Sequence, residues 1–159
     1  MADQTSSSIV VDAAPAEVMA VIADFPSYPA WVQGMKSVEV VQERDGVAEQ
    51  VHFELEATPI KDSYTLAYDW NGDRSVSWHL VQGKMLKAME GSYTLAPQVG
   101  GTEVTYRLAV DVSIPMIGML KRKAEKVIID RALSGLKKRV EQVPPAAGSG
   151  SGNASGKTL

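Results

Sequence analysis

The sequence predicts a single α+β domain in which a curved antiparallel sheet is covered by one long C-terminal helix. Segments of alternating apolar and polar residues follow one another from Val38 to Val112, with no helical pattern between them. Short turns rich in glycine, aspartate and asparagine separate these segments. The last apolar pattern, which follows residue 113, has instead the 3.6-residue period of a helix. We expect the domain to cover residues 1–143.

The N-terminal part is expected to form one strand and two short helices. Residues 8–12 are rich in β-branched side chains, which is typical of a short strand. Pro15 suits the first position of a helix, the next apolar residues recur at helical spacing, and Pro26 ends the pattern. A second, short helical turn is expected over residues 27–32, closed by Gly34.

The middle of the chain is expected to form a meander of strands. The expected strands contain Val38 and Val40 and then residues 47–57, 64–70, 76–80, 85–95 and 104–112. The turns between them are Asp45-Gly46, Asn71-Gly72-Asp73, Gln82-Gly83 and Gly100-Gly101, which supply the positive φ angles of tight hairpins. Gly91 lies inside a strand pattern and predicts a bend or a close approach of another group.

One long helix is expected to begin at Ser113-Ile114-Pro115 and to end before Pro144. Its apolar positions are Met116, Ile117, Leu120, Ala124, Val127, Ile128, Leu136 and Val140. Its other face is basic: Lys121, Arg122, Lys123, Lys126, Arg131, Lys137, Lys138 and Arg139, partly offset by Glu125, Asp130 and Glu141. Residues 144–159 are rich in glycine, serine and proline and are expected to be a disordered tail.

This order of elements predicts an internal cavity. A single helix, about 10 Å wide with its side chains, is too narrow to cover a broad curved sheet, so a helix-grip arrangement leaves space between helix and sheet. The residues that we expect to bind a ligand there are Trp31, Phe53, Leu55, Tyr64, Leu66, Trp78, Leu80, Met89, Tyr93, Tyr106, Met116, Ile117 and Leu120. Each of them taken singly is more often a packed core residue.

Composition excludes several classes of function. The chain has no cysteine, which excludes disulfides, thiolate metal sites and thiol nucleophiles. The net charge of -3 gives no support for nucleic-acid binding. The N-terminal residues lack the pattern of a signal peptide, and no apolar run has the length of a transmembrane helix, so we expect a cytoplasmic protein. We expect no cofactor, and a monomer or weak homodimer.

The sequence identifies no catalytic residue. His52 and His79 alternate with apolar neighbours and are expected to face outward, and Glu54 and Glu56 are more consistent with a solvated strand face. Tyr64 and Tyr106 could donate hydrogen bonds inside the cavity, and Arg74 and Glu90 lie on expected strands from which they could reach it. We find no serine–histidine–acid order, no glycine-rich phosphate loop and no metal cluster.

Four segments carry a resemblance to a known family. They are residues 9–18 (IVVDAAPAEV), 24–31 (DFPSYPAW), 91–95 (GSYTL) and 101–106 (GTEVTY). On these the chain resembles the SRPBCC or START-like superfamily, and within it the actinobacterial polyketide cyclase/dehydrase and lipid-transport group. The resemblance spans roughly residues 6–142 and implies a START/Bet v 1-like helix-grip fold. It departs from the family at Ala14, where many relatives have a polar helix cap.

The resemblance implies several functions, because one scaffold hosts different chemistries. The first hypothesis is a carrier or sequestering protein for a lipid, isoprenoid or polyketide-like molecule. The second is a polyketide aromatase/cyclase or dehydratase, in which arginine, tyrosine, serine or histidine side chains would steer the substrate. The third is a quinone-binding or protein-interaction module. The basic face of the long helix is expected to be solvated or to touch anionic membrane lipids transiently.

Overall fold

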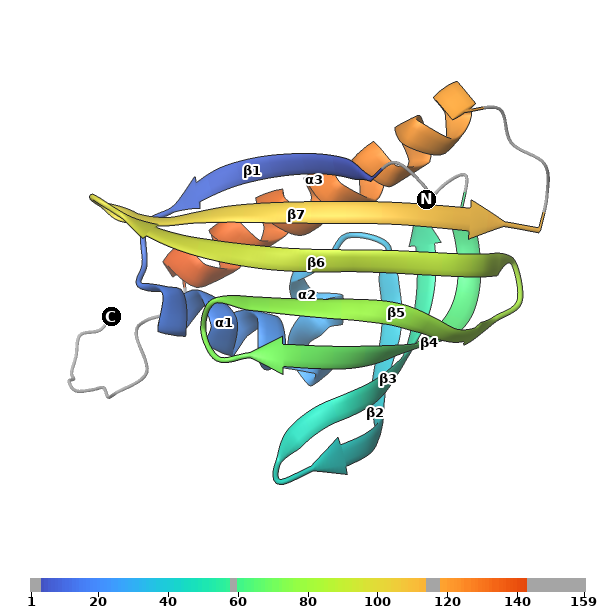
Figure 1. Cartoon of the computed structure of the whole chain (residues 1–159), viewed down its shortest axis with the longest axis horizontal. Helices are drawn as coiled ribbons and strands as arrows, with labels where there is room; N and C mark the ends of the chain where they lie inside the picture. The colour runs from blue at the N-terminus through green and yellow to red at the C-terminus, as the bar shows by residue number, and fades with distance from the viewer. Residues whose placement is uncertain (1–3, 58–59, 114–117, 143–159) are drawn as a thin grey trace.

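The computed structural model describes residues 4–57, 60–113 and 118–142. Seven strands form one antiparallel sheet in the order β1-β7-β6-β5-β4-β3-β2 (Figure 1). The strands are β1 (Thr5–Val11), β2 (Met35–Arg44), β3 (Val47–Ala57), β4 (Ile60–Asn71), β5 (Ser75–Gly83), β6 (Leu86–Gln98) and β7 (Gly101–Val112). The helices are α1 (Pro15–Ala23), the 3-10 turn η1 (Phe25–Ser27), α2 (Tyr28–Trp31) and α3 (Gly118–Gln142).

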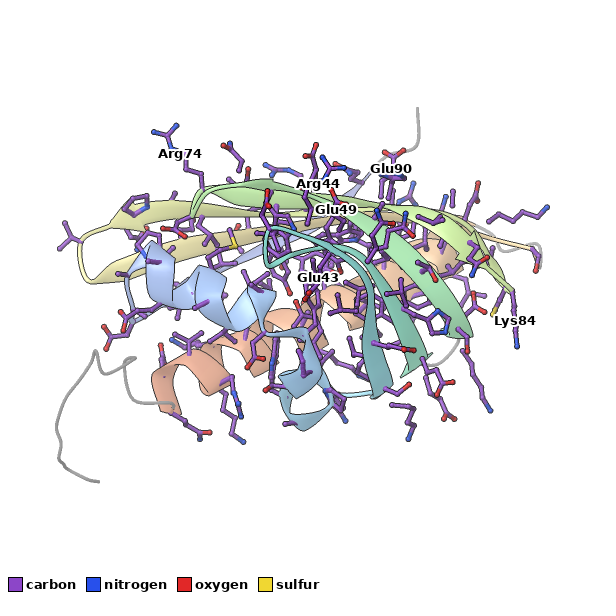
Figure 2. The ribbon with its side chains drawn as sticks, turned by 90° about the horizontal axis from the view of Figure 1, so that it is seen from below. Glu43, Arg44, Glu49, Arg74, Lys84 and Glu90 are labelled. Carbon is purple, nitrogen blue, oxygen red and sulfur yellow. The ribbon has the colours of Figure 1, made fainter. Side chains whose placement is uncertain are left out.

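The helices lie together on one side of the sheet, which arches over them (Figures 1 and 2). Helix α3 contacts β1 and β7, whereas α1 contacts α3 and the ends of β6 and β7. This confirms the predicted α+β helix-grip fold, with a curved sheet, a long C-terminal helix and short helices after the first strand. The expected tail, residues 144–159, lies outside the described residues.

Local sequence explains how the ends of these elements are formed. Asp45 and Gly46 have φ angles of 53° and 79°, so they form the tight hairpin turn that was predicted between β2 and β3. Ala14 offers no capping side chain to α1, but Glu17 supplies the other half of a capping box: its Oε1 accepts the Ala14 N–H at 3.0 Å. A carboxylate in the first helical turn is also favoured by the helix dipole.

Several boundaries differ from the sequence prediction: β4 begins at Ile60 rather than at residue 64, and β7 begins at Gly101 rather than at residue 104. Strand β1 begins at Thr5 rather than at residue 8, because the polar residues that precede Ser8 still pair with β7, ending with Thr5 opposite Leu108. Backbone pairing does not need apolar side chains, so a prediction from the pattern of apolar residues underestimates the length of the strand. The expected start of the long helix falls largely outside the described residues, and α3 as described begins at Gly118.

The buried face of α3 also differs from the expected one. Its buried residues are Ala124, Glu125, Ile129, Ala132, Leu133, Leu136 and Val140. Leu120, which was expected inside, is 41% exposed. Glu125, which was expected among solvated charges, is 1% exposed because both of its carboxylate oxygens have partners. Oε1 accepts the hydroxyl of Thr5, and Oε2 accepts the backbone N–H of Val110 at 2.8 Å.

Candidate functional site

A narrow cavity lies between α3 and the face of the sheet that the helices cover. Its volume is about 60 Å³, which is room for several water molecules. The lining comes from α2, the segment after it and the start of β2, from strands β3 to β7, and from the middle of α3: Tyr28, Val32, Gln33, Met35, Phe53, Leu55, Tyr64, Leu66, Tyr68, Trp78, Met89, Tyr93, Tyr106, Ile128, Arg131 and Ala132. The wall is therefore mostly aromatic and aliphatic.

The cavity brings together most of the residues expected from the sequence. Those that line it are Phe53, Leu55, Tyr64, Leu66, Trp78, Met89, Tyr93 and Tyr106. They belong to β3–β7, where the alternation of side chains determines which residues face the helices. For these strands the predicted inner face is the observed one.

The other expected ligand-binding residues lie elsewhere or outside the described part of the chain. Trp31 packs its ring against Tyr28, behind the lining, at a centroid distance of 5.0 Å. Leu80 is half-buried beyond the lined part of β5, and Leu120 lies exposed on α3, where the helix phase turns it away from the sheet. Met116 and Ile117 are outside the described residues.

Sequence reasoning did not assign half of the lining residues to the site. Tyr68 alternates with Tyr64 and Leu66, so the same strand pattern could have identified it. The segment Val32–Met35 shows no periodicity, and only the fold places it at the rim of the cavity. Arg131 was assigned to the solvated basic face, yet it is half-buried and lines the cavity.

All five tyrosines of the chain line this cavity: Tyr28, Tyr64, Tyr68, Tyr93 and Tyr106. The hydroxyl of Tyr28 donates to the carbonyl oxygen of Ile22. Within the described part of the chain, the other four hydroxyls have no hydrogen-bond partner, and none of them is sealed away from the cavity space. Burial raises the pKa of all five tyrosines above its usual value. They are therefore neutral hydroxyls that can donate hydrogen bonds but cannot act as bases near neutral pH.

The aromatic rings of the wall hold one another in place. The ring of Trp78 lies 5.5 Å from that of Tyr93 and 5.4 Å from that of Tyr106, and the two tyrosine rings are 4.7 Å apart. Gly91 makes this arrangement possible, because a Cβ atom there would lie 2.5 Å from the indole of Trp78. The predicted close approach at Gly91 is thus a contact with the cavity wall.

The remaining candidates for chemistry lie away from the cavity. Arg74, in the turn before β5, and Glu90, on β6, project from the side of the sheet opposite the helices (Figure 2) and are exposed, so neither reaches the cavity. His79 is exposed, and His52 Nδ1 lies 3.0 Å from the hydroxyl oxygen of Thr65 outside the lining. Among the described residues, no group of three histidine, aspartate or glutamate side chains could hold a metal ion.

Several basic residues of α3 are paired rather than free. Lys126 Nζ lies 2.7 Å from Asp130, and Lys137 Nζ lies 2.6 Å from Glu141, each one helical turn away. Lys137 also donates to the carbonyl oxygen of Val10, so it ties α3 to β1. None of the helices in the described ranges combines the length and apolar character that a membrane crossing requires.

The comparisons with known proteins agree with this fold. A START superfamily protein from Mycobacterium smegmatis is 21% identical, with a TM-score of 0.81 over 87% of this chain and 97% of that one. The Zhui aromatase/cyclase from Streptomyces sp. R1128 is 15% identical, with a TM-score of 0.72 over 92% and 98% of the two chains. The di-domain aromatase/cyclase BexL of the BE-7585A biosynthetic pathway is 19% identical, with a TM-score of 0.68 over 88% of this chain and 47% of that one.

At these identities the structures establish similarity of fold alone. No curated protein matches the sequence. The family model described as polyketide cyclase/dehydrase and lipid transport matches residues 3–141, nearly the whole length of the chain. The chain therefore belongs to the polyketide cyclase/dehydrase and lipid transport family.

Proposed function

We propose that this protein binds a hydrophobic small molecule, such as a lipid, an isoprenoid or a polyketide-like compound, and acts as its carrier or sequestering protein. The observation that carries the proposal is the cavity between α3 and the sheet, with its aromatic and aliphatic lining. Burying roughly 300 Å² of apolar ligand surface would gain about 7 kcal/mol before ordering costs are subtracted. Such a gain is compatible with micromolar to millimolar binding.

The groups in the lining favour binding over catalysis. The described lining contains no aspartate, glutamate, histidine or lysine side chain. Its tyrosines are held neutral by burial, so none of the described lining residues is suited to abstract a proton near neutral pH. The wall can hold a molecule in a chosen position, which is what a carrier requires.

A polyketide aromatase/cyclase is the second candidate, and one observation favours it. The unpartnered hydroxyls of Tyr64, Tyr68, Tyr93 and Tyr106 lie along one cavity and could donate to several carbonyl oxygens of a poly-ketone chain. Folding such a chain into a reactive conformation needs positioning more than strong acids or bases. Cyclised product formed from a poly-β-ketone above the uncatalysed rate would establish this candidate over the carrier.

Binding can be tested by native mass spectrometry of protein purified from its own host, together with displacement of a fluorescent lipid probe. We expect a co-purified apolar molecule. We also expect probe binding to weaken at least tenfold in Trp78→Ala, because this ring lines the cavity and contacts the rings of Tyr68, Tyr93 and Tyr106. The control is His79→Ala, the exposed neighbour on β5. Absence of both a co-purified molecule and probe binding would rule out the cavity as a ligand site.

Delivery of the molecule would include a transient contact with a membrane. Arg122, Lys123 and Lys138 are exposed on α3 and supply positive charge for anionic lipid head groups. Co-sedimentation with anionic vesicles should fall when these three residues are replaced by glutamine, whereas binding to neutral vesicles should not change. We expect a monomer or weak homodimer in sedimentation analysis.

A further inference from the structure

Among the lining residues that the structure describes, one side chain is charged, the cationic side chain of Arg131. Its Nη1 atom lies beside Gly34, 3.3 Å from the place where a Cβ atom would be. Gly34 has a φ of 94° and is flanked by Gln33 and Met35, both of which line the cavity. The missing side chain at Gly34 leaves room for the backbone carbonyl oxygen of Glu56, 2.7 Å from the same position, and beside it for the guanidinium at the rim between α3 and the segment that follows α2.

This guanidinium has no charged partner among the described residues. Lys121, Lys126 and Lys137 on the same helix each form an ion pair. Arg131 forms neither an ion pair nor a side-chain hydrogen bond with any described residue. The helix positions three and four residues away from it are Val127, Ile128, Ser134 and Gly135, none of which is acidic. Burying part of a guanidinium without a counter-charge costs free energy, because the group loses some of its bound water and gains no partner in return.

The cavity thus has two chemically different ends. Aromatic and aliphatic side chains line its interior on β3–β7, whereas Gln33 and Arg131 bring amide and guanidinium donors to its rim. Resting on the proposed binding function, we infer that the ligand is an amphiphile with an anionic head group. The head group is a carboxylate or phosphate held by Arg131 at the rim, and the apolar tail lies among the tyrosines. Arginine suits either group, because its planar fork offers two parallel donors to an oxyanion.

The test compares dodecanoate, dodecyl phosphate and dodecanol, all below their critical micelle concentrations, by displacement of a neutral fluorescent probe. The three compounds share one tail length and differ in the head group. We expect at least one anion to bind about tenfold or more tightly than dodecanol to the wild type, since a charge-assisted hydrogen bond contributes that much. The stronger of the two anions identifies the head group as carboxylate or phosphate.

Two variants separate the role of Arg131 from overall charge. Arg131→Gln should abolish the preference for the anion and leave dodecanol binding within about twofold. Arg107→Gln removes the same charge from an exposed position on β7 outside the lining and should retain the preference. Equal affinity for all three compounds in the wild type, or a preference that survives in Arg131→Gln, would overturn the inference while leaving the binding function intact. Failure of every compound to bind would instead count against the binding function itself.

Discussion

The two halves of the interior use the same sheet and the same helix but differ in packing. At the end where α1 joins α3 against β6 and β7, the core consists of fully buried aliphatic side chains such as Val18, Ile22, Val104 and Leu136, each 0% exposed. Between α2 and the middle of α3, bulky rings and Met89 surround the cavity instead. We call these regions the sealed end and the cavity end.

The difference shows how a hollow can persist in a small domain. At the sealed end two helices cover the sheet, so small branched side chains are sufficient to fill the space between them. At the cavity end α3 covers the broad sheet with only the short helix α2 beside it, and the rings reach inward without meeting completely. The rings of the wall also pack against one another, as Tyr93 does against Tyr106. These contacts stabilise the wall, so its side chains can stay in place without packing against α3.

The largest expected effect is alkaline unfolding that begins at the cavity end. Burial raises the pKa of all five tyrosines in the folded protein, so above the ordinary pKa of about 10 the unfolded chain loses these protons first. Stability is therefore unaffected by these groups below that pH and falls as pH rises above it. Circular dichroism and tyrosinate absorbance should change together in one titration. Tyrosines that ionise near pH 10 while the protein stays fully folded would contradict the burial of these hydroxyls at the cavity end.

The second effect contrasts one leucine from each end. Leu136→Ala at the sealed end should lower the free energy of unfolding by about 2–5 kcal/mol, because a well-packed site cannot close the space left behind. Leu66→Ala at the cavity end should cost about 1 kcal/mol less, since Leu66 already borders empty space. Urea denaturation measures both. Equal losses would show that the cavity end is packed as tightly as the sealed end.

The third effect concerns the glycine under the cavity wall. Gly91→Ala should cost about 1–3 kcal/mol, because its Cβ would push the indole of Trp78 inward. The displaced ring should also reduce probe binding. Ser92→Ala on the opposite face of β6 is the control and should change stability by less than about 0.5 kcal/mol. An unchanged affinity in Gly91→Ala would mean that Trp78 does not shape the bound state.

The smallest effect on stability is expected for Tyr106→Phe. Its hydroxyl has no partner within the described residues, so removal should change the free energy of unfolding by less than about 0.5 kcal/mol. A ligand with an acceptor near this hydroxyl should bind about fivefold more weakly. Thermal denaturation and probe displacement separate the two quantities. A large loss of stability without any loss of affinity would assign the hydroxyl to the core.

The strands of the cavity wall could be predicted because alternation fixes the direction of each side chain. Phe53, Tyr64, Trp78 and Tyr106 each lie where the period-two pattern placed them. The hairpin turn at Asp45-Gly46 followed from residues that tolerate positive φ. These features depend on local sequence alone, so the sequence pattern was sufficient to predict them.

Features of α3 could not be read in the same way. Its many basic residues and interspersed apolar ones fit more than one helix phase, and the sequence favoured the phase that buries Leu120 over the one that buries Glu125. The observed phase depends on Thr5 and on the Val110 N–H, which meet the Glu125 carboxylate only in the folded chain. The position of Arg131 at the rim depends likewise on Gly34, distant in sequence.

The small size of the cavity has a consequence for how quickly cargo can be exchanged. Pockets for drug-sized molecules usually measure about 300–1,000 Å³, whereas this cavity measures about 60 Å³. A guest must part the rings and the flexible side chains of Met35 and Met89 before it fits. The opening of the wall, rather than diffusion of the ligand, should therefore limit the rates of ligand entry and release. These rates should depend steeply on temperature, and a bound ligand should stay long once the wall has closed.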